Sequence, residues 1–593
     1  MDWTWRERSV LGLGLLLRLG LPLSAWLISR DPSIFYSRDT ASYIGLAQAV
    51  LSGEGFSMGG IPELVRTPGY PLFLLPGMLA GAVEPLTITL QAIAGTITVG
   101  LVMAVTKGLS SSRGAVVLAG FAYAIEPLAL LYTGKILSES LFALCLMLAA
   151  LHLQRSLRSS SWVGLAGAAL ALSFAAYVRP IGYFLPAVTA LTWLVVVVLR
   201  KSVTGGVVAR IAVFLAISMS ALGVWQVRNS LTAGYARFSA ITEVTLYEYL
   251  AAAVRADDEG LPYYEVREQM LRAAEASRGP DLSEGEYYRR LGEIGGQMIA
   301  ARPWVFLNAY VKGVIRVALD PGGVEYLKLF EQYPESGGLL GLIVDKGVLG
   351  AVLQLARERP EALLVTTLFG LILALYWVLA AAGARSVLRE RPLRVEGVLM
   401  LVWPAYILLI SGGPAALDRF RHPIMPLLAV LAGVGAAGTG PVRRRLHTID
   451  GRERRPRRDG KGKAIALLGA EGQEGAQGAA SPPGFLPPLA KPVMQGRRPS
   501  SSDEAAAMRI PIVARDHPGC RPVVEHRVKG LLVPPGDVTG LTDAVLGPLR
   551  DSEMRQKMGA RGVGMAARRL ATERIVARYK GLHIELGLES ALA

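Results

Sequence analysis

The feature that most constrains this chain is a series of ten long apolar segments. A helix that crosses a bilayer needs about 20 mostly apolar residues. Segments close to this length lie at 9–29, 86–106, 114–132, 139–155, 162–178, 181–199, 208–226, 361–382, 396–412 and 423–440. Only 19% of the residues are charged, whereas soluble globular chains carry about 25%. We therefore expect an α-helical polytopic membrane protein with about ten transmembrane helices.

Two segments need separate treatment. The stretch 68–83 is apolar but short, and it contains three prolines, so we expect an interfacial or re-entrant segment there. The first span follows Arg6 and Arg8 and has no clear small-residue cleavage site. It is therefore predicted to be a retained helix rather than a cleaved signal peptide.

Basic residues in the short loops predict the orientation, because cytoplasmic loops carry an excess of Lys and Arg. With the N-terminus in the cytoplasm, most basic loops fall on that side. They hold Lys107, Arg113, Arg155, Arg158, Arg200, Lys201, the arginines of 385–394 and the run that begins at Arg443. Both termini are thus expected in the cytoplasm, with residues 30–85 and 227–360 on the external side.

Ionisable residues gather at the external ends of the predicted spans. They are Arg38, Asp39, Glu63, Arg66, Arg179, Arg228, Arg419 and Arg421, with Glu126 and Glu139 close by. Charges at membrane depth are costly and usually pair or serve a site. Anchoring of single arginines at lipid headgroups is the alternative, but it does not explain the accompanying carboxylates.

The segment after the first span predicts a short helix that begins near Asp39. Asp39, Tyr43, Leu46 and Ala47 are spaced to share one helical face. Asp is a favoured N-cap residue, and a cap could also serve as a catalytic carboxylate.

Five motifs in chain order resemble one family. They are Asp39-x3-Tyr43 followed by Arg66-Thr67-Pro68-Gly69-Tyr70-Pro71, then Leu137-Ser138-Glu139, Val178-Arg179-Pro180, Trp225 to Asn229 (WQVRN), and Arg419-Phe420-Arg421-His422-Pro423. Together they resemble membrane glycosyltransferases of the GT-C fold, including protein O-mannosyltransferases and lipid A aminoarabinose transferases (family 39-type). The resemblance covers about residues 1–440.

The resemblance implies transfer of a sugar from a polyprenyl-phosphate donor to a lipid, glycan or protein acceptor on the external face of a bacterial inner membrane. Asp39 is then the expected base or a carboxylate that orients the acceptor. Glu139 is a second catalytic candidate, which would shape the acceptor pocket or hold a cation. Phosphate binding is expected from some of Arg66, Arg179, Arg228, Arg419 and Arg421, because guanidinium groups suit phosphate. Tyr70 is a further candidate for substrate binding. Some relatives use a divalent metal, but the sequence assigns it no ligands, and no other cofactor is expected.

Two other functions are compatible with the same sequence. One is a flippase or transporter of lipid-linked sugars, although no internal repeat of the kind common in transporters is seen. The other is an envelope polysaccharide polymerase or ligase, which would take a lipid diphosphate donor.

The remaining polar segments indicate how the chain is divided into domains. Residues 302–319 carry Arg302, Lys312 and Arg316 and are predicted to form a juxtamembrane helix rather than a span. Residues 443–463 hold ten Lys and Arg against three Asp and Glu, which favours contact with anionic lipid headgroups and not nucleic acid. We predict a membrane domain at 1–442, a basic and Gly/Ala/Pro-rich linker at 443–503, and a further segment at 504–593.

Residues 504–590 carry a second resemblance, to the C-terminal end of family-4 GT-B glycosyltransferases. Glu504 stands where that family has its second nucleotide-sugar-binding glutamate, but position 496, where its partner would be, is Gly. Strands are predicted at 511–514 and 530–533. About 85 residues cannot build two nucleotide-binding domains, so we expect a silent remnant or a docking module.

Overall fold

The computed structural model describes residues 3–279, 282–330, 332, 339–389 and 395–438, and short stretches between 512 and 557. The chain divides into two compact units, Met1–Lys461 and Gly462–Ala593. The first unit contains the predicted membrane domain. The predicted boundaries at 442/443 and 503/504 fall outside the described residues and stay predictions.

The first unit is helical. Its N-terminal half comprises α1 (Trp5–Ser29), η1 (Pro32–Phe35), α2 (Thr40–Leu51), β1 (Ser57–Met58), β2 (Ile61–Pro62), α3 (Gly69–Leu79), α4 (Val83–Leu109), α5 (Arg113–Ala124), α6 (Pro127–Thr133), α7 (Glu139–Ser159), α8 (Trp162–Val178), η2 (Pro180–Gly182), α9 (Leu185–Leu199) and α10 (Gly205–Ala233). The two short strands pair antiparallel.

The remainder of the first unit begins with short helices and ends with long ones. It comprises α11 (Ile241–Val244), η3 (Thr245–Ala251), α12 (Ala252–Glu259), α13 (Tyr263–Ala276), α14 (Glu284–Ala301), α15 (Pro303–Leu319), α16 (Gly323–Leu329), α17 (Leu339–Glu358), α18 (Pro360–Arg389), α19 (Val395–Ile410), η4 (Asp418–Ile424) and α20 (Met425–Gly438). The segment η3 is a π-helix, and η4 is a 3₁₀-helix.

The helical membrane class predicted from the sequence is confirmed. In the described part of the chain, seven helices are long and apolar enough to cross a membrane, and the bent pair α5–α6 makes an eighth if it is one span. The other two predicted spans form the shorter helices α8 and α19, of 17 and 16 residues. The number of ten therefore stays a prediction. Residues 69–79 form an 11-residue helix that contains Pro76, too short to cross.

Arg18 lies inside the first span and is fully buried. Its guanidinium donates to the carbonyl oxygens of Tyr123 at 3.1 Å and Ala124 at 3.2 Å, at the C-terminal end of α5. Carbonyls at a helix end lack intrahelical partners, so a buried arginine satisfies them where α5 breaks from α6. This explains an arginine in an otherwise apolar span.

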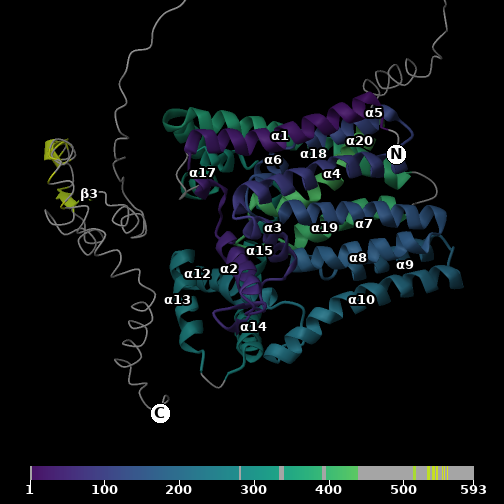
Figure 1. Cartoon of the computed structure of the whole chain (residues 1–593), viewed down its shortest axis with the longest axis horizontal. Helices are drawn as coiled ribbons and strands as arrows, with labels where there is room; N and C mark the ends of the chain where they lie inside the picture. Colours follow the sequence, from purple (N-terminus) through teal and green to yellow (C-terminus); the bar gives the residue numbers. More distant parts are fainter. Residues whose placement is uncertain are drawn as a thin grey trace, which may run out of the picture. The chain divides into compact units, whose positions relative to one another are not determined.

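The two ends of the helical bundle carry different ion pairs. Glu7 pairs with Lys107 at 2.7 Å and Arg158 with Glu396 at 3.2 Å, so these residues of the predicted cytoplasmic side share one end. Asp39 follows the far end of α1. In Figure 1 the N-terminus lies at one end of the long helices, and α2 and α12–α14 gather at the other.

The region after α10 forms a small helical layer with its own core. Val266, Met270 and Leu291 are buried together with Tyr247 and Ala251. The helix α15 has 17 residues and is not among the candidate spans. A helix is thus present at 303–319, and its position beside the membrane stays a prediction. The segment that leads into this layer is hydrogen-bonded to residues 64 and 65, next to Arg66.

The second unit contains two parallel strands, β3 (Ile512–Arg515) and β4 (Gly530–Val533), with Ile512 opposite Gly530. They match the predicted strands to within one residue. Glu504 lies outside the described residues.

Candidate functional site

Asp39 precedes α2 as its N-cap residue, but its carboxylate makes no capping hydrogen bond. The neighbouring Thr40 fixes this segment instead, because its hydroxyl donates to the carbonyl of Ile136 at 3.0 Å. The backbone N–H of Ile136 in turn donates to the carbonyl of Phe35 at 2.9 Å. These bonds hold Asp39 next to the segment that leads into Glu139 and leave its carboxylate for other partners.

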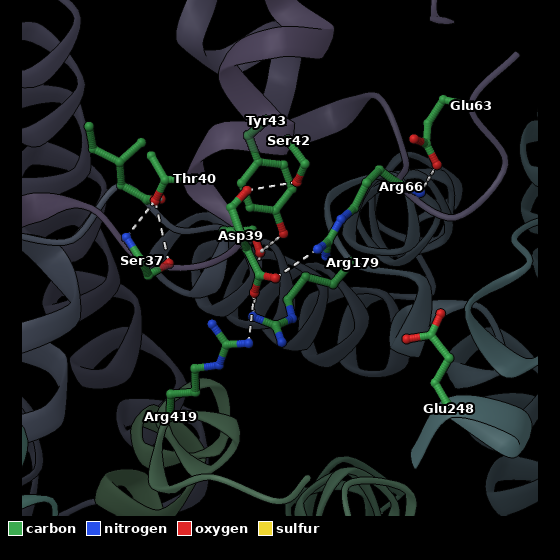
Figure 2. Close-up of polar contacts among 12 residues, drawn as sticks. Ser37, Asp39, Thr40, Ser42, Tyr43, Glu63, Arg66, Arg179, Glu248 and Arg419 are labelled. Carbon is green, nitrogen blue, oxygen red and sulfur yellow. Dashed lines mark hydrogen bonds and ion pairs between the residues drawn. The ribbon is translucent and has the colours of Figure 1, made fainter. Parts of the chain in front are cut away.

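Two arginines from distant parts of the chain bind the Asp39 carboxylate (Figure 2). Arg66 Nη2 lies 2.7 Å from Oδ1, and Arg419 Nη2 lies 2.7 Å from Oδ2. Each carboxylate oxygen therefore has its own guanidinium, which is a strong, charge-assisted arrangement. The Asp39 side chain therefore pairs with arginines and does not cap α2.

Glu139 forms the second half of the cluster. It is the first residue of α7, and its Oε1 lies 2.5 Å from Arg179 Nη1 and 3.9 Å from Arg419 Nε. Neither carboxylate oxygen has a hydrogen bond of good geometry within the described chain. Arg419 thus joins both carboxylates, and Glu139 keeps unused acceptor capacity. We refer to Asp39, Arg66, Glu139, Arg179 and Arg419 as the ion-pair cluster.

The ion-pair cluster is closed on one side and open on the other. Side-chain exposure is 1% for Glu139, 17–19% for Arg419, Arg179 and Asp39, and 27% for Arg66. Three guanidinium groups face two carboxylates, which leaves one excess positive charge. A site with this balance attracts an anion at its open side, beside Arg66.

An aromatic ring allows two of the arginines to approach each other. The guanidinium carbons of Arg179 and Arg419 lie 5.8 and 5.1 Å from the ring centre of Phe420. Arg66 likewise lies 5.2 Å from the ring centre of Tyr43. Aromatic rings attract cations, so these rings offset part of the repulsion between like charges. Phe420 and Ser138, which contacts Arg179 at 3.4 Å, were not predicted as site residues although they lie inside the quoted motifs.

Residues 63–66, which we call the Arg66 loop, are held by hydrogen bonds from their backbone to the Glu63 side chain. Glu63 Oε1 accepts from the N–H groups of Val65 and Arg66 at 2.6 and 2.8 Å. The hairpin before it turns at Gly59 and Gly60, whose φ angles are +58° and +82°. A two-residue turn with both φ angles positive favours glycine, so the sequence shapes this loop locally.

Gly69 sets the distance between the Arg66 loop and the end of α8. A Cβ at this position would lie 2.6 Å from the carbonyl oxygen of Tyr177 and 2.8 Å from the nitrogen of Val178.

We expect Gly69→Ala to lower the free energy of unfolding by about 2 kcal/mol, because backbone atoms must move to admit the methyl group. Thermal unfolding of the purified protein in detergent checks this. Gly12→Ala, whose Cβ meets nothing within 4 Å, is the control, and equal melting temperatures of the two variants would contradict the prediction.

Three predicted substrate-binding residues are not part of the ion-pair cluster. Arg228 donates to the carbonyl oxygens of Glu63, at 2.8 Å, and Phe56, and thereby ties the end of α10 to the hairpin loop. Arg421 is 1% exposed and donates to the carbonyl of Val317 at 2.7 Å. Tyr70 is fully buried and donates to Gln91 at 2.8 Å. Their side chains hold loops and helices in place, and contact with substrate stays a prediction for them.

The charges around Asp39 determine its pKa. Burial would raise the pKa of this carboxyl, but the guanidinium groups of Arg419 and Arg66 outweigh burial and hold the pKa well below its usual range. Asp39 is therefore ionised at neutral pH and, while both arginines bind it, is a weak base.

This depressed pKa predicts a pH dependence of stability. A carboxyl whose pKa is lowered on folding contributes stability above its unfolded pKa of about 3.9, and that contribution is lost as pH falls through the lower folded value. The difference in melting temperature between wild type and Asp39→Asn should therefore be constant from about pH 5 to 8 and shrink toward pH 3. A difference that is the same at pH 3 and pH 7 would contradict the prediction.

Within the described residues, no group of three or more His, Cys, Asp or Glu side chains is arranged to hold a metal ion. The two carboxylates of the cluster are ion-paired with arginines.

Comparison with protein families concerns the C-terminal part of the chain. Residues 499–564 match the family described as glycosyl transferases group 1. A curated relative, N-acetyl-alpha-D-glucosaminyl L-malate synthase of Bacillus anthracis, is 29% identical over 83 residues, which are 14% of this chain and 22% of the relative. The resemblance of this segment to glycosyltransferases is confirmed, and the chain spans about a fifth of that relative's length.

Comparison with solved structures concerns most of the chain. One similar structure is the archaeal oligosaccharyltransferase AglB of Archaeoglobus fulgidus in complex with an inhibitory peptide and a dolichol-phosphate. Its TM-score is 0.44 at 14% identity, over 77% of this chain and 52% of that one. Two others are ArnT of Cupriavidus metallidurans, apo and bound to undecaprenyl phosphate, with TM-scores of 0.32 and 0.31, identities of 14% and 15%, and coverage of 90% and 91% of this chain and 88% of theirs. The chain thus spans about half the length of the oligosaccharyltransferase.

Proposed function

We propose that this protein is a membrane glycosyltransferase that takes a sugar from a polyprenyl-phosphate donor. The observation that carries the proposal is the ion-pair cluster, which meets at the end of the helical bundle away from the N-terminus. A buried site that is rich in arginine suits a phosphate group, since guanidinium binds phosphate oxygens in a planar, bidentate manner. The surrounding apolar helices suit the lipid that carries it.

The charge of the cluster favours one class of donor. A sugar linked to a lipid by one phosphate is a diester with a single negative charge, which matches the single excess positive charge of the cluster. A diphosphate donor would bring two. The proposal is therefore a monophosphate donor, rather than the diphosphate of a polymerase or ligase.

In the proposed reaction, the donor phosphate replaces the Asp39 carboxylate as the partner of two arginines. The donor phosphate binds Arg66 and Arg419 and draws them away from Asp39, so the pKa of Asp39 rises toward its ordinary value. An acceptor hydroxyl oxygen then forms a bond to the anomeric carbon, and its proton passes to Asp39. The bond from that carbon to the phosphate oxygen breaks with its electron pair, and the arginines stabilise the departing phosphate. The family resemblance implies inversion at the sugar.

The proposed setting follows the charge pattern of the loops. The chain is a multi-pass membrane protein, and we place it in a bacterial inner membrane with both termini in the cytoplasm. The ion-pair cluster then lies on the external side, together with the acceptor.

Transfer by the full-length protein in liposomes tests the proposal. The probes are undecaprenyl phosphates that carry radiolabelled mannose, glucose or aminoarabinose, with extracted envelope material as acceptor. The expected result is label in the acceptor and free undecaprenyl phosphate with at least one donor. Turnover of undecaprenyl diphosphate oligosaccharide alone would contradict the proposed donor class.

A further inference from the structure

The π-helix η3 is fixed next to the segment that carries Arg66. Immediately before α11, which leads into η3, the N–H of Ala240 donates to the carbonyl of Leu64 at 2.8 Å. The hydroxyl of Ser239 donates to the carbonyl of Val65 at 2.7 Å. Arg66 is the next residue along the chain, so the start of this helical region is bonded to the Arg66 loop.

The other end of η3 is fixed next to the segment that leads to Arg419. Leu250 is buried, and a Cβ on Gly413 would lie 2.7 Å from its Cδ2 atom. Gly413 also donates its N–H to the carbonyl of Tyr310 in α15 at 3.2 Å. The π-helix is thus held between the two segments that supply the guanidinium partners of Asp39.

Some side chains of η3 are buried and others are partly exposed. Leu250 and Ala251 are buried, and buried Tyr247 donates its hydroxyl to the carbonyl of Met270 at 3.2 Å. Glu248 and Tyr249 are half-buried. A π-helix is rare and is found frequently at functional sites. Here Tyr247, Leu250 and Ala251 are buried, whereas Glu248 and Tyr249 both contact Arg267.

Glu248 is held on one oxygen only. Arg267 Nη2 donates to Oε2 of Glu248 at 3.1 Å and lies 3.4 Å from the hydroxyl of Tyr249. Among the described residues, Oε1 accepts no hydrogen bond, and 19% of the Glu248 side chain is exposed. Figure 2 shows the Glu248 carboxylate directed toward the side of the view where Arg66 and Arg179 lie, without a bond to either.

We propose that Glu248, positioned by Arg267, accepts a hydrogen bond from a carbohydrate hydroxyl in the substrate of the ion-pair cluster. The inference rests on the proposed function and adds a specificity-determining residue to it. With the phosphate on the arginines, the attached sugar extends through the open side of the cluster toward the helical layer that contains η3. That hydroxyl belongs to the donor sugar or to a sugar in the acceptor.

The electrostatics of Glu248 agree with this role. Burial raises the pKa of Glu248, and its ion pair with Arg267 does not fully offset the effect. The pKa of Asp39 is shifted in the opposite direction by two arginines. Glu248 is therefore the more basic carboxylate and the better hydrogen-bond acceptor for a neutral hydroxyl group.

Binding measurements on the full-length protein in nanodiscs test the inference. The probes are undecaprenyl phosphate and the glycosylated lipid that proves active as donor. For Glu248→Gln we expect about tenfold weaker binding of the glycosylated lipid, as for loss of one charged hydrogen bond, with unchanged binding of undecaprenyl phosphate. If the hydroxyl is in the acceptor, donor binding stays unchanged and the KM for acceptor rises about tenfold.

Two further variants complete the experiment. Glu286→Gln, on α14, removes an exposed carboxylate that also pairs with an arginine and should change neither value. Glu248→Asp keeps the charge but shortens the side chain, and it should reproduce the loss if Glu248→Gln does not fold. Wild-type values for both donor binding and KM in the Glu248 variants overturn the inference and leave the proposed function intact. Failure of the wild type to bind undecaprenyl phosphate overturns both.

Discussion

Replacing Asp39 by asparagine is expected to lower sugar transfer about 1,000-fold, within the range typical for loss of a general base. The amide has almost the same shape as the carboxylate but cannot take the acceptor proton. It also leaves Arg66 and Arg419 with no negative charge between them. The measurement is the initial rate of label transfer from the active undecaprenyl-phosphate sugar, at equal amounts of folded protein.

Asp31→Asn is the matched control for this variant. Asp31 lies on the same segment between α1 and α2 and caps η1 by accepting from the N–H of Ser33 at 2.8 Å. Asparagine caps equally well, so activity should stay within about twofold of wild type. If Asp39→Asn transferred sugar at a rate close to the control, Asp39 would have no part in catalysis.

Replacing Arg419 by lysine is expected to lower transfer about 100-fold. Arg419 contacts both Asp39 and Glu139, and one ammonium group cannot reproduce a planar fork that reaches two carboxylates. The charge is kept, so the loss reports on geometry rather than on net charge. The rate of transfer and the affinity for undecaprenyl phosphate should both fall, because the same guanidinium is proposed to bind the phosphate.

Arg38→Lys is the control for the arginine variant. Arg38 is exposed and precedes Asp39 in the chain, but it is not one of the arginines that bind the Asp39 carboxylate. Its replacement should leave transfer within about twofold of wild type. An Arg419→Lys variant that keeps more than a third of wild-type activity would contradict the role given to Arg419.

Local patterns in the sequence predicted the segments that form the site. The helical spacing of Asp39, Tyr43, Leu46 and Ala47 predicted α2, and the three apolar side chains are buried as expected. The short, proline-containing stretch that follows was predicted not to span, and it forms the 11-residue helix α3. These features depend on neighbouring residues, so sequence periodicity captures them.

The pairing of charges could not be predicted in the same way. Asp39 and Arg419 are 380 positions apart, and no local pattern tells which of the predicted site arginines meets which carboxylate. Arg228 and Arg421 stood in motifs as prominent as that of Arg179, yet their side chains bind backbone carbonyls. Arg18 stands in an otherwise apolar span, but its partners at the end of α5 depend on how α1 packs on that helix.

The residue proposed to recognise the sugar hydroxyl had no visible signal in the sequence. Glu248 lies in a polar stretch with several other carboxylates, including Glu243 and Asp257. Its position is set by contacts on either side of a π-helix, which hydrophobic periodicity does not reveal. Only the packing of η3 between the segments that lead to Arg66 and Arg419 identifies Glu248 as a candidate.

A cryo-electron microscopy structure of the full-length protein with undecaprenyl phosphate in nanodiscs tests the central claim most directly. The account predicts that the phosphate lies within hydrogen-bond distance of Arg66 and Arg419, with at least one of these arginines moved away from the Asp39 carboxylate. A phosphate bound at the opposite end of the bundle, near Lys107 and Arg158, with the ion-pair cluster unchanged, would contradict it.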